Sequence, residues 1–338
     1  MPAPVCLIVN PAAGGGRAGR VAPAVLGALS GWGLRVERWD AADCEHARAL
    51  AREAATRGSV AAVLGGDGLA GAAAEALRDV PGAVLGVLPA GRGNDLARVL
   101  GIGADPIAAC ETIARGVPMA MDVGEVRRLG ADGQPYGASR AFVGIASAGF
   151  DSDANRIANE ASPRLGELVY AYGALRALVR WRPARFHIEL DPPGSRYELC
   201  GYSIAAANSQ AYGGGMRLAP HALLDDGLLD VVAIEHIARL RLLMCLPRVF
   251  RGSHLQMANV RELCAEVIDI TASRPFTLYA DGDPIFELPV RVRAVRAALE
   301  VLVRPDRTTG VFGASPRATR GQGQAASVGD VSGLASSR

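Results

Sequence analysis

Continuous apolar runs separated by alanine-rich segments dominate the first third of this 338-residue chain. The runs lie at residues 5–9, 59–64 and 84–88, and a shorter strand is expected at 35–38. Unbroken apolar strands between helices are buried on both faces, as in a parallel sheet that helices cover on each side. The alternation therefore predicts a Rossmann-like α/β domain with a parallel sheet.

Helix signals fill the intervals between these strands. Asp43 is a plausible N-cap for a helix that runs to residue 57, because its carboxylate can accept the free N–H groups of the first turn. Gly58 suits the left-handed residue that ends such a helix. The other helices are expected at residues 19–30, at 69–77 and from residue 95 to 100.

The sequence pattern changes after residue 123 to strand-like runs separated by Gly- and Pro-containing turns. Two helical stretches, 165–181 and 237–250, interrupt these runs. Many short strands with turn signals between them are typical of a β-sandwich. We therefore expect an α/β plus β architecture with two domains.

The expected domain limits follow from this change in the sequence pattern. They are an α/β nucleotide-binding domain at 1–123, a β-sandwich domain at 124–295, a return of the chain to the first domain near 296–312, and a tail at 313–338. The tail is rich in Gly, Ser, Ala, Gln and Arg without periodicity, so we expect it to be disordered.

The chain contains no Lys, so all 36 of its basic residues are Arg. Schiff-base chemistry is excluded, and so are the P-loop and the protein-kinase strand, because each needs a Lys. Any phosphate must then be handled by main-chain N–H groups, Arg or a metal ion. The formal net charge of +2 gives no large field that would indicate a nucleic-acid partner.

Three glycine-rich loops follow three strands of the first domain, at residues 10–17, 65–68 and 89–95. Loops at the carboxyl ends of parallel strands meet at one edge of the sheet, where ligands bind. Glycines let main-chain N–H groups converge on an anion, and a helix start adds its dipole. Because two of these loops carry Asp67 and Asp95, a nucleotide with Mg²⁺ is the favoured ligand.

Other carboxylates are ambiguous from the residues alone. Asp122 ends a strand-like run and is best interpreted as a turn or cap residue. Asp281 and Asp283 flank Gly282 between two strand-like runs, which predicts a hairpin turn with solvated carboxylates. Residues 225–230, DDGLLD, form either a turn or a site for a hard cation.

Several of these segments occur in an order that resembles a known family. They are GGDG at 65–68, PAGRGND at 89–95 followed by LAR, GFD at 149–151, YGGGM at 212–216, DDGLLDV at 225–231 and DGD at 281–283. Together they are similar to the bacterial diacylglycerol kinases, lipid kinases related to sphingosine and ceramide kinases. NAD kinase shares the GGDG motif, but the GFD, YGGGM and DDGLLDV segments favour the lipid branch.

The resemblance implies an enzyme, a phosphotransferase that moves the γ-phosphoryl group of ATP to a lipid hydroxyl. Its default acceptor is diacylglycerol, which gives phosphatidic acid for phospholipid metabolism. The fold it implies is a nucleotide-binding α/β domain followed by a β-sandwich, with ATP and Mg²⁺ as cofactors. Two alternatives stay open, a kinase for another lipid alcohol such as a sphingoid base, ceramide or glycolipid precursor, and a degenerate kinase that acts as a nucleotide- or lipid-binding regulator.

The resemblance also assigns site residues by motif. Asp281 would be the general base that takes the hydroxyl proton. The nucleotide would be bound by Asn10, Gly65, Gly66, Asp67, Gly68, Arg92, Gly93, Asn94, Asp95 and Asp283. The carboxylates implied around Mg²⁺ and its waters are those of Asp67, Asp95 and Asp122. A structural Mg²⁺ site would use Asp226 with the carbonyl groups of Leu223 and Leu228.

The chain departs from the family pattern at three positions. Leu69 replaces the usual Thr after GGDG, and Arg92 replaces a Thr between the glycines of the third loop. Asp283 stands where the family usually has Glu. Arg92 either neutralises phosphate charge in place of the lost hydroxyl groups or is simply solvated.

Cell context and partners can be predicted only broadly. Six Cys without metal spacing and five scattered His argue against zinc and fit a cytoplasmic protein. We expect no signal peptide and no membrane span. Arg residues flanking Trp181 and others on the 237–250 helix suit peripheral contact with the inner face of a membrane, which would supply the lipid, although ordinary solvated Arg is an equal interpretation. A homodimer formed edge to edge by two sandwiches stays open.

Overall fold

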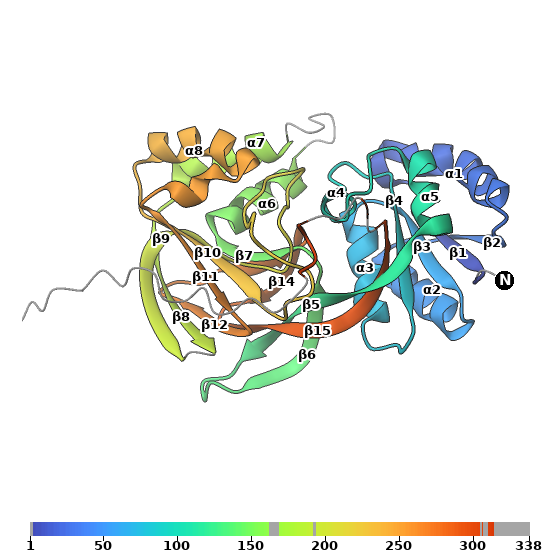
Figure 1. Ribbon diagram of the computed structural model, residues 1–338. Helices are drawn as coiled ribbons and strands as arrows, with labels where there is room; N and C mark the ends of the chain where they lie inside the picture. The colour runs from blue at the N-terminus through green and yellow to red at the C-terminus, as the bar shows by residue number, and fades with distance from the viewer. Residues whose placement is uncertain (1–2, 162–168, 192–193, 305, 307–309, 314–338) are drawn as a thin grey trace, which may run out of the picture.

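The apolar runs of the first domain form a parallel sheet in the order β2–β1–β3–β4 (Figure 1). The computed structural model describes residues 3–161, 169–191, 194–304, 306 and 310–313. The strand bounds are Val5–Val9 for β1, Val36–Asp40 for β2, Val60–Gly65 for β3 and Val84–Pro89 for β4. Every residue of β1 is buried, because the central strand has helices over both faces.

The first domain has five helices. Two helices pack together on each face of the sheet, and the fifth, α4, is a short helix near the second domain (Figure 1). The pair α1 and α5 covers one face, and the pair α2 and α3 covers the other. The bounds are Ala13–Gly31 for α1, Cys44–Thr56 for α2, Asp67–Leu77 for α3, Asp95–Val99 for α4 and Pro106–Arg115 for α5. The predicted N-cap is confirmed, since the Asp43 carboxylate accepts the N–H of His46 at 2.8 Å.

The second domain is a β-sandwich of mostly antiparallel strands. Its strands are β5 Val117–Leu129, β6 Pro135–Phe142, β7 Ile145–Gly149, β8 Ala184–Asp191, β9 Ser195–Ala207, β10 Leu229–Glu235, β11 Val260–Ala265, β12 Val267–Ala272, β13 Thr277–Ala280 and β14 Asp283–Glu287. Burial alternates residue by residue along β8, as expected for a strand with one face toward a core. The predicted architecture, an α/β domain followed by a β-sandwich, is therefore confirmed.

Three helices accompany the sandwich: α6 Phe150–Glu160, α7 Val169–Arg180 and α8 Arg239–Arg251. The core between them and the strands is aromatic. Trp181 lies there with its ring 5.8 Å from the ring of Phe150 and 6.2 Å from that of Tyr202. The described helices include none long and apolar enough to cross a bilayer.

The long strand β15, Val290–Val303, connects the two domains. Its first half pairs with β12 and its whole length pairs antiparallel with β5. Its last residues pair parallel with β4, Glu300 opposite Val84 and Val301 opposite Leu85. A single strand thus runs from the sandwich into the nucleotide-domain sheet (Figure 1). The predicted tail falls, apart from Gly313, outside the described residues.

Candidate active site

Asp281 occupies the turn between β13 and β14, in the left-handed region with φ of 51°. Its Oδ2 accepts the N–H of Val143 at 2.8 Å. Its Oδ1 accepts the N–H groups of Gly144 at 2.9 Å and Ile145 at 3.2 Å. Three main-chain donors at the start of β7 therefore fix the position of this carboxylate, while Oδ2 keeps a lone pair for another donor.

Burial raises the pKa of Asp281 to about 7, and the nearby charge of Asp67 acts in the same direction. The three main-chain N–H groups oppose this rise because they stabilise the ionised form. A carboxylate with a pKa near neutrality can both accept and release a proton at neutral pH. This is the property that a general base requires.

The Asp281 carboxylate faces helix α3 of the first domain. A Cβ placed on Gly71 would lie 3.5 Å from Oδ2 of Asp281. Gly71 is one helical turn after Asp67, the first residue of α3. The turn of the second domain is therefore apposed to the start of a helix whose free N–H groups and dipole favour anions.

The second and third glycine loops meet through their main chains. A Cβ on Gly91 would lie 2.3 Å from the Cα of Gly66, a distance that no side chain tolerates. A Cβ on Gly93 would lie 2.6 Å from Oδ2 of Asp67. The sheet-edge arrangement expected from the sequence is therefore present for these two loops.

Asp67 links the same two loops through its carboxylate. Its Oδ1 accepts the N–H of Leu96, in the first turn of α4, at 3.2 Å. Burial raises the pKa of Asp67, and the neighbouring charge of Asp95 adds to the rise, against the opposing effect of main-chain N–H groups. A divalent cation bound between the carboxylates of Asp67 and Asp95 would relieve the repulsion that Asp67 experiences.

Asp95 connects the first domain to the YGGGM segment of the second. Its buried carboxylate forms an ion pair with Arg98 and accepts the N–H of Gly214 at 2.8 Å. Arg98 also donates to the carbonyl of Gly93 at 3.1 Å. Arg98 was not predicted as a site residue, although its i, i+3 spacing from Asp95 was a usable signal.

Other predicted nucleotide residues have local structural roles. Asn94 adopts a left-handed conformation and braces its own loop, its Oδ1 accepting the N–H of Gly91 at 2.8 Å and its Nδ2 donating to the carbonyl of Gly91 at 3.0 Å. Asn10 accepts the N–H of Ala12 at 3.1 Å. Gly65 ends β3 and Gly68 is exposed in the first turn of α3. Their predicted contacts with nucleotide stay predictions.

The two departures from the family pattern near these loops have different environments. Leu69 is buried and joins the core of the first domain, where its side chain packs against Gly65. The missing hydroxyl is therefore replaced by core packing. Arg92 is exposed, and no hydrogen bond or ion pair to it is seen within the described ranges, so its guanidinium is available to an anion.

Among the described residues Asp122 does not form one cluster of metal ligands with Asp67 and Asp95, and its predicted place around Mg²⁺ and its waters stays a prediction. Within the described part of the chain, no three acidic, His or Cys side chains lie close enough to hold a metal. The carboxylate of Asp122 instead accepts the N–H of Gly227 and, at 2.7 Å, the N–H of Ala297. Both oxygens are used to fix the DDGLLDV loop against β15, as the cap interpretation predicted.

The predicted structural Mg²⁺ site lies in that same loop. Asp226 is buried, and its Oδ1 accepts the N–H of Leu228 at 3.1 Å. Leu223 precedes a main-chain link from the N–H of Leu224 to the carbonyl of Val311 at 2.8 Å. Asp226 is the single carboxylate of the proposed ligand set, so its pairing with the carbonyls of Leu223 and Leu228 stays a prediction.

An ion network beside the site joins the domains and was not predicted. The carboxylate of Glu75 in α3 accepts three hydrogen bonds. The donors are Nε of Arg48 at 2.7 Å, Nε of Arg140 in β6 at 2.8 Å and the N–H of Ala141 at 3.1 Å. Asp283 lies in the turn beside this network. Partial burial raises the pKa of its carboxyl group, and the positive charges of Arg140 and Arg48 oppose that rise. The network fixes α3, which carries Asp67, relative to the strand that leads into Val143.

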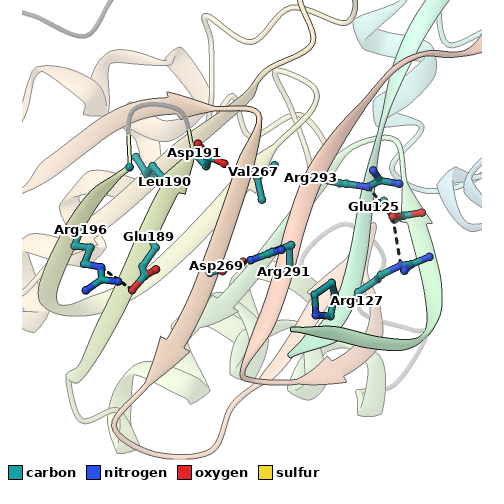
Figure 2. A pocket seen from close by; sticks show the side chains of 12 residues that line it. Glu125, Arg127, Glu189, Leu190, Asp191, Arg196, Val267, Asp269, Arg291 and Arg293 are labelled. Carbon is teal, nitrogen blue, oxygen red and sulfur yellow. Dashed lines mark hydrogen bonds and ion pairs between the residues drawn. The ribbon is translucent and has the colours of Figure 1, made fainter. Parts of the chain in front are cut away.

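A hollow on the outer face of the sandwich lies away from these residues (Figure 2). Its volume is about 540 Å³. Its guanidinium groups are paired with carboxylates, among them Arg291 with Asp269 at 2.7 Å and Arg293 with Glu125 at 2.8 Å. None of Asp67, Asp95 and Asp281 lines it, so we place the active site at the Asp281 turn and not in this hollow.

Two family models match the chain in succession. The diacylglycerol kinase catalytic domain matches residues 4–126, and the YegS C-terminal NAD kinase β-sandwich-like domain matches residues 144–303. The crystal structure of a diacylglycerol kinase from Bacillus anthracis superposes with a TM-score of 0.67 at 18% identity, over 90% of this chain and 98% of that one. At that identity the likeness supports the fold.

Curated relatives extend over most of the chain. A diacylglycerol kinase of Mycobacterium tuberculosis is 33% identical over 303 residues, which is 88% of this chain and 94% of the relative. A probable YegS-like lipid kinase of Pseudomonas fluorescens is 32% identical over 287 residues, 82% of this chain and 88% of the relative. The chain therefore belongs to the diacylglycerol kinase family of lipid kinases, phosphotransferases that act on an alcohol acceptor.

Proposed function

We propose that this protein transfers the γ-phosphoryl group of ATP to the free hydroxyl of diacylglycerol, giving phosphatidic acid and ADP. The observation that carries the proposal is the Asp281 carboxylate, held by three N–H groups, with its pKa near 7, opposite the start of α3. The name of the relative from Mycobacterium tuberculosis, a diacylglycerol kinase, supports diacylglycerol as the acceptor.

In this reaction Asp281 would accept the proton of the acceptor hydroxyl as its oxygen attacks the γ-phosphorus. The new oxygen–phosphorus bond forms while the bond between the γ-phosphorus and the bridging oxygen breaks, and ADP leaves. A positioned base contributes roughly 10²- to 10⁴-fold to such a step. Because the carboxylate is already oriented by main-chain donors, little reorganisation precedes proton transfer.

Charge on the transferred phosphoryl group would be balanced without Lys. Glycine-loop N–H groups and the start of α3 can bind phosphate oxygens, and Arg92 has a free guanidinium nearby in the third loop. Asp67 and Asp95 would hold Mg²⁺, which neutralises phosphate charge in phosphoryl transfer. Burial and the negative charge of Asp95 raise the pKa of Asp67, and a bound Mg²⁺ would relieve the repulsion between the two carboxylates.

The proposal is tested by incubating the protein with γ-labelled ATP, Mg²⁺ and a mixed lipid extract, and then separating the lipids. We expect the label in phosphatidic acid. Label in a different phospholipid would show that another lipid alcohol is the acceptor. Tight ATP binding without transfer to any lipid would contradict a kinase and support the regulatory alternative.

A further inference from the structure

Helices α7 and α8 carry a concentration of exposed apolar side chains. Nine large hydrophobic side chains are exposed in the described part of the chain, and five of them lie on these two helices. The five are Tyr172, Leu175 and Val179 of α7 and Met244 and Phe250 of α8. Single exposed apolar residues are ordinary, but a cluster marks an interaction surface.

Both helices are firmly packed through their opposite faces. Ala177 and Leu178 of α7 are buried against the aromatic core, and Leu242, Cys245 and Val249 of α8 are also buried. Each helix therefore already has a buried face. On α7 the exposed residues Tyr172, Leu175 and Val179 recur at helical spacing and share one face, and on α8 Met244 and Phe250 are exposed, all outside the buried faces.

The charged side chains of helices α7 and α8 have one sign, although Asp153 and Glu160 of α6 line the same hollow as Tyr172 and Arg176. The segments α7 and α8 contain no Asp or Glu. Arg176, Arg241, Arg248 and Arg251 are exposed, and no ion pair joins any of them to a carboxylate of the described residues. On the neighbouring helix α6, by contrast, Arg156 pairs with Glu160 at 3.2 Å.

A direct contact makes the two helices one surface. Arg239, the first residue of α8, donates to the carbonyl of Val179 at 3.3 Å and to that of Trp181 at 2.9 Å. These carbonyls lie at the C-terminal end of α7, where a cation also stabilises the helix dipole. In Figure 1 the two helices lie side by side along one edge of the sandwich.

We propose that this surface docks the protein on an anionic lipid bilayer. The α7–α8 face consists of the five apolar side chains named above together with Arg176, Arg241, Arg248 and Arg251. Apolar side chains enter the interface while Arg groups contact lipid phosphates, as in amphipathic interfacial helices. The inference rests on the proposed function, because a kinase for diacylglycerol must take its substrate from a bilayer.

Charge distinguishes a bilayer from two other occupants. A second copy of this chain placed on the face by a two-fold axis would bring Arg against Arg, because such an interface uses the same patch twice. An acidic protein would satisfy the Arg groups but gives no reason for five apolar side chains spread over two helices. An anionic bilayer accommodates both kinds of side chain at once.

The size of the effect follows from the charge. Each Arg near an anionic membrane surface contributes roughly fivefold to partitioning at moderate salt. Neutralising Arg241, Arg248 and Arg251 together should therefore weaken vesicle binding by about 100-fold. Replacing Leu175, Val179 and Met244 by Ser should weaken binding to the same vesicles and should also reduce its salt-resistant part.

Vesicle flotation with the full chain tests the inference. The vesicles are phosphatidylcholine alone, or phosphatidylcholine with phosphatidylglycerol. The charge variant combines Arg241→Gln, Arg248→Gln and Arg251→Gln. Its matched control combines Arg35→Gln, Arg52→Gln and Arg196→Gln, which removes the same net charge from exposed positions away from this face. Circular dichroism and thermal unfolding would be measured to check that each variant folds.

We expect wild-type and control protein to float with phosphatidylglycerol-containing vesicles and the charge variant to stay behind. Equal binding to neutral and anionic vesicles, or equal loss in the control variant, would overturn the inference. Failure of the wild-type protein to float with either kind of vesicle would also overturn the inference. Binding of an acidic protein by this face in that case would favour a protein partner instead.

Activity measurements keep the inference separate from the proposed function. A water-dispersed short-chain diacylglycerol needs no docking, so the charge variant should phosphorylate it at the wild-type rate. The same variant should lose activity roughly in proportion to binding when long-chain diacylglycerol is supplied in anionic vesicles. Activity on vesicles unchanged in the charge variant overturns docking alone, whereas no transfer to either acceptor by the wild-type protein overturns the kinase function alone.

Discussion

The carboxylate of Asp281 obtains its position from residues that lie 136 to 138 positions earlier in the chain. The Asp-Gly step correctly predicted a hairpin turn, because the turn is a local property of the sequence. The contact with Val143, Gly144 and Ile145 is a tertiary property that no local pattern shows. For this reason the residues alone favoured a solvated carboxylate, and only the family resemblance indicated a base.

The pKa of Asp281 makes activity depend on pH. Below pH 7 the carboxylate is protonated and cannot accept a proton, so kcat/KM should fall about tenfold per pH unit and should level off above pH 7. Initial rates measured across this range, with protein stability checked at each pH, test the point. Rates that stay level down to pH 5 would contradict a base with this pKa.

Gly144 offers a way to move Asp281 without removing its carboxylate. A Cβ at residue 144 would lie 2.5 Å from Oδ1 of Asp281, so Gly144→Ala should displace the base. We expect kcat to fall by about 10²-fold, within the range of a general-base contribution, with unchanged ATP affinity. Steady-state kinetics and calorimetric titration of ATP measure the two quantities, and a lowered ATP affinity with normal kcat would be the opposite outcome.

At the scale of elements, the strands and loops of the first domain were predictable because their signals are local. Continuous apolar runs gave β1, β3 and β4 close to their observed bounds. Helix α5 was missed although Pro106 and the N-cap Asp105 mark its start. Helix α6 was missed because residues 149–151 were interpreted only as a motif. Residues 165–168 of the helix expected at 165–181 fall outside the described ranges.

The contact between the second and third loops can be tested through Gly91. Gly91→Ala places a Cβ against the main chain at Gly66, so the free energy of unfolding should fall by about 1–3 kcal/mol and nucleotide affinity should fall with it. Gly103→Ala is the matched control, because the space around Gly103 is open and this residue lies outside the glycine loops. Denaturant unfolding compares the two variants, and equal stability would show that the loops separate readily.

At the scale of the molecule, β15 and the Glu75 network fix the two domains relative to each other. The sequence could suggest that the chain returns to the first domain, but the network depends on side chains from α2, α3 and β6 that meet only after folding. Asp122 belongs to this level as well. Its two main-chain partners, Gly227 and Ala297, lie more than a hundred residues away, so its role could not be decided from its neighbours.

Removing the Glu75 carboxylate should loosen the domain contact. Glu75→Gln leaves Arg48 and Arg140 without their shared partner and should lower the free energy of unfolding by about 2 kcal/mol. Glu45→Gln removes the exposed second partner of Arg48 and should change stability by under about 0.5 kcal/mol. Urea unfolding at neutral pH measures both, and equal effects would contradict a specific role for Glu75.

The same variant should show a defined pH dependence. Burial disfavours the Glu75 charge, but the N–H of Ala141 and the two Arg groups outweigh it and lower the pKa below its usual 4.5. The stabilisation is therefore present above pH 4.5 and is lost as the pH falls through the lowered value. Wild type and Glu75→Gln should converge in stability at acid pH, and a difference that persists there would exclude this ion network as its source.

Asp281 is proposed to be the base of a diacylglycerol kinase, and the rate of phosphatidic acid formation by Asp281→Asn tests this role most directly. The matched control is Asp132→Asn, in the exposed turn after β5, where Asn can still accept the N–H of Gln134. We expect kcat to fall roughly 10²- to 10⁴-fold in the Asp281 variant, with ATP binding and folding retained, and to be unchanged in the control. Phosphatidic acid formed by Asp281→Asn at the wild-type rate would contradict the account.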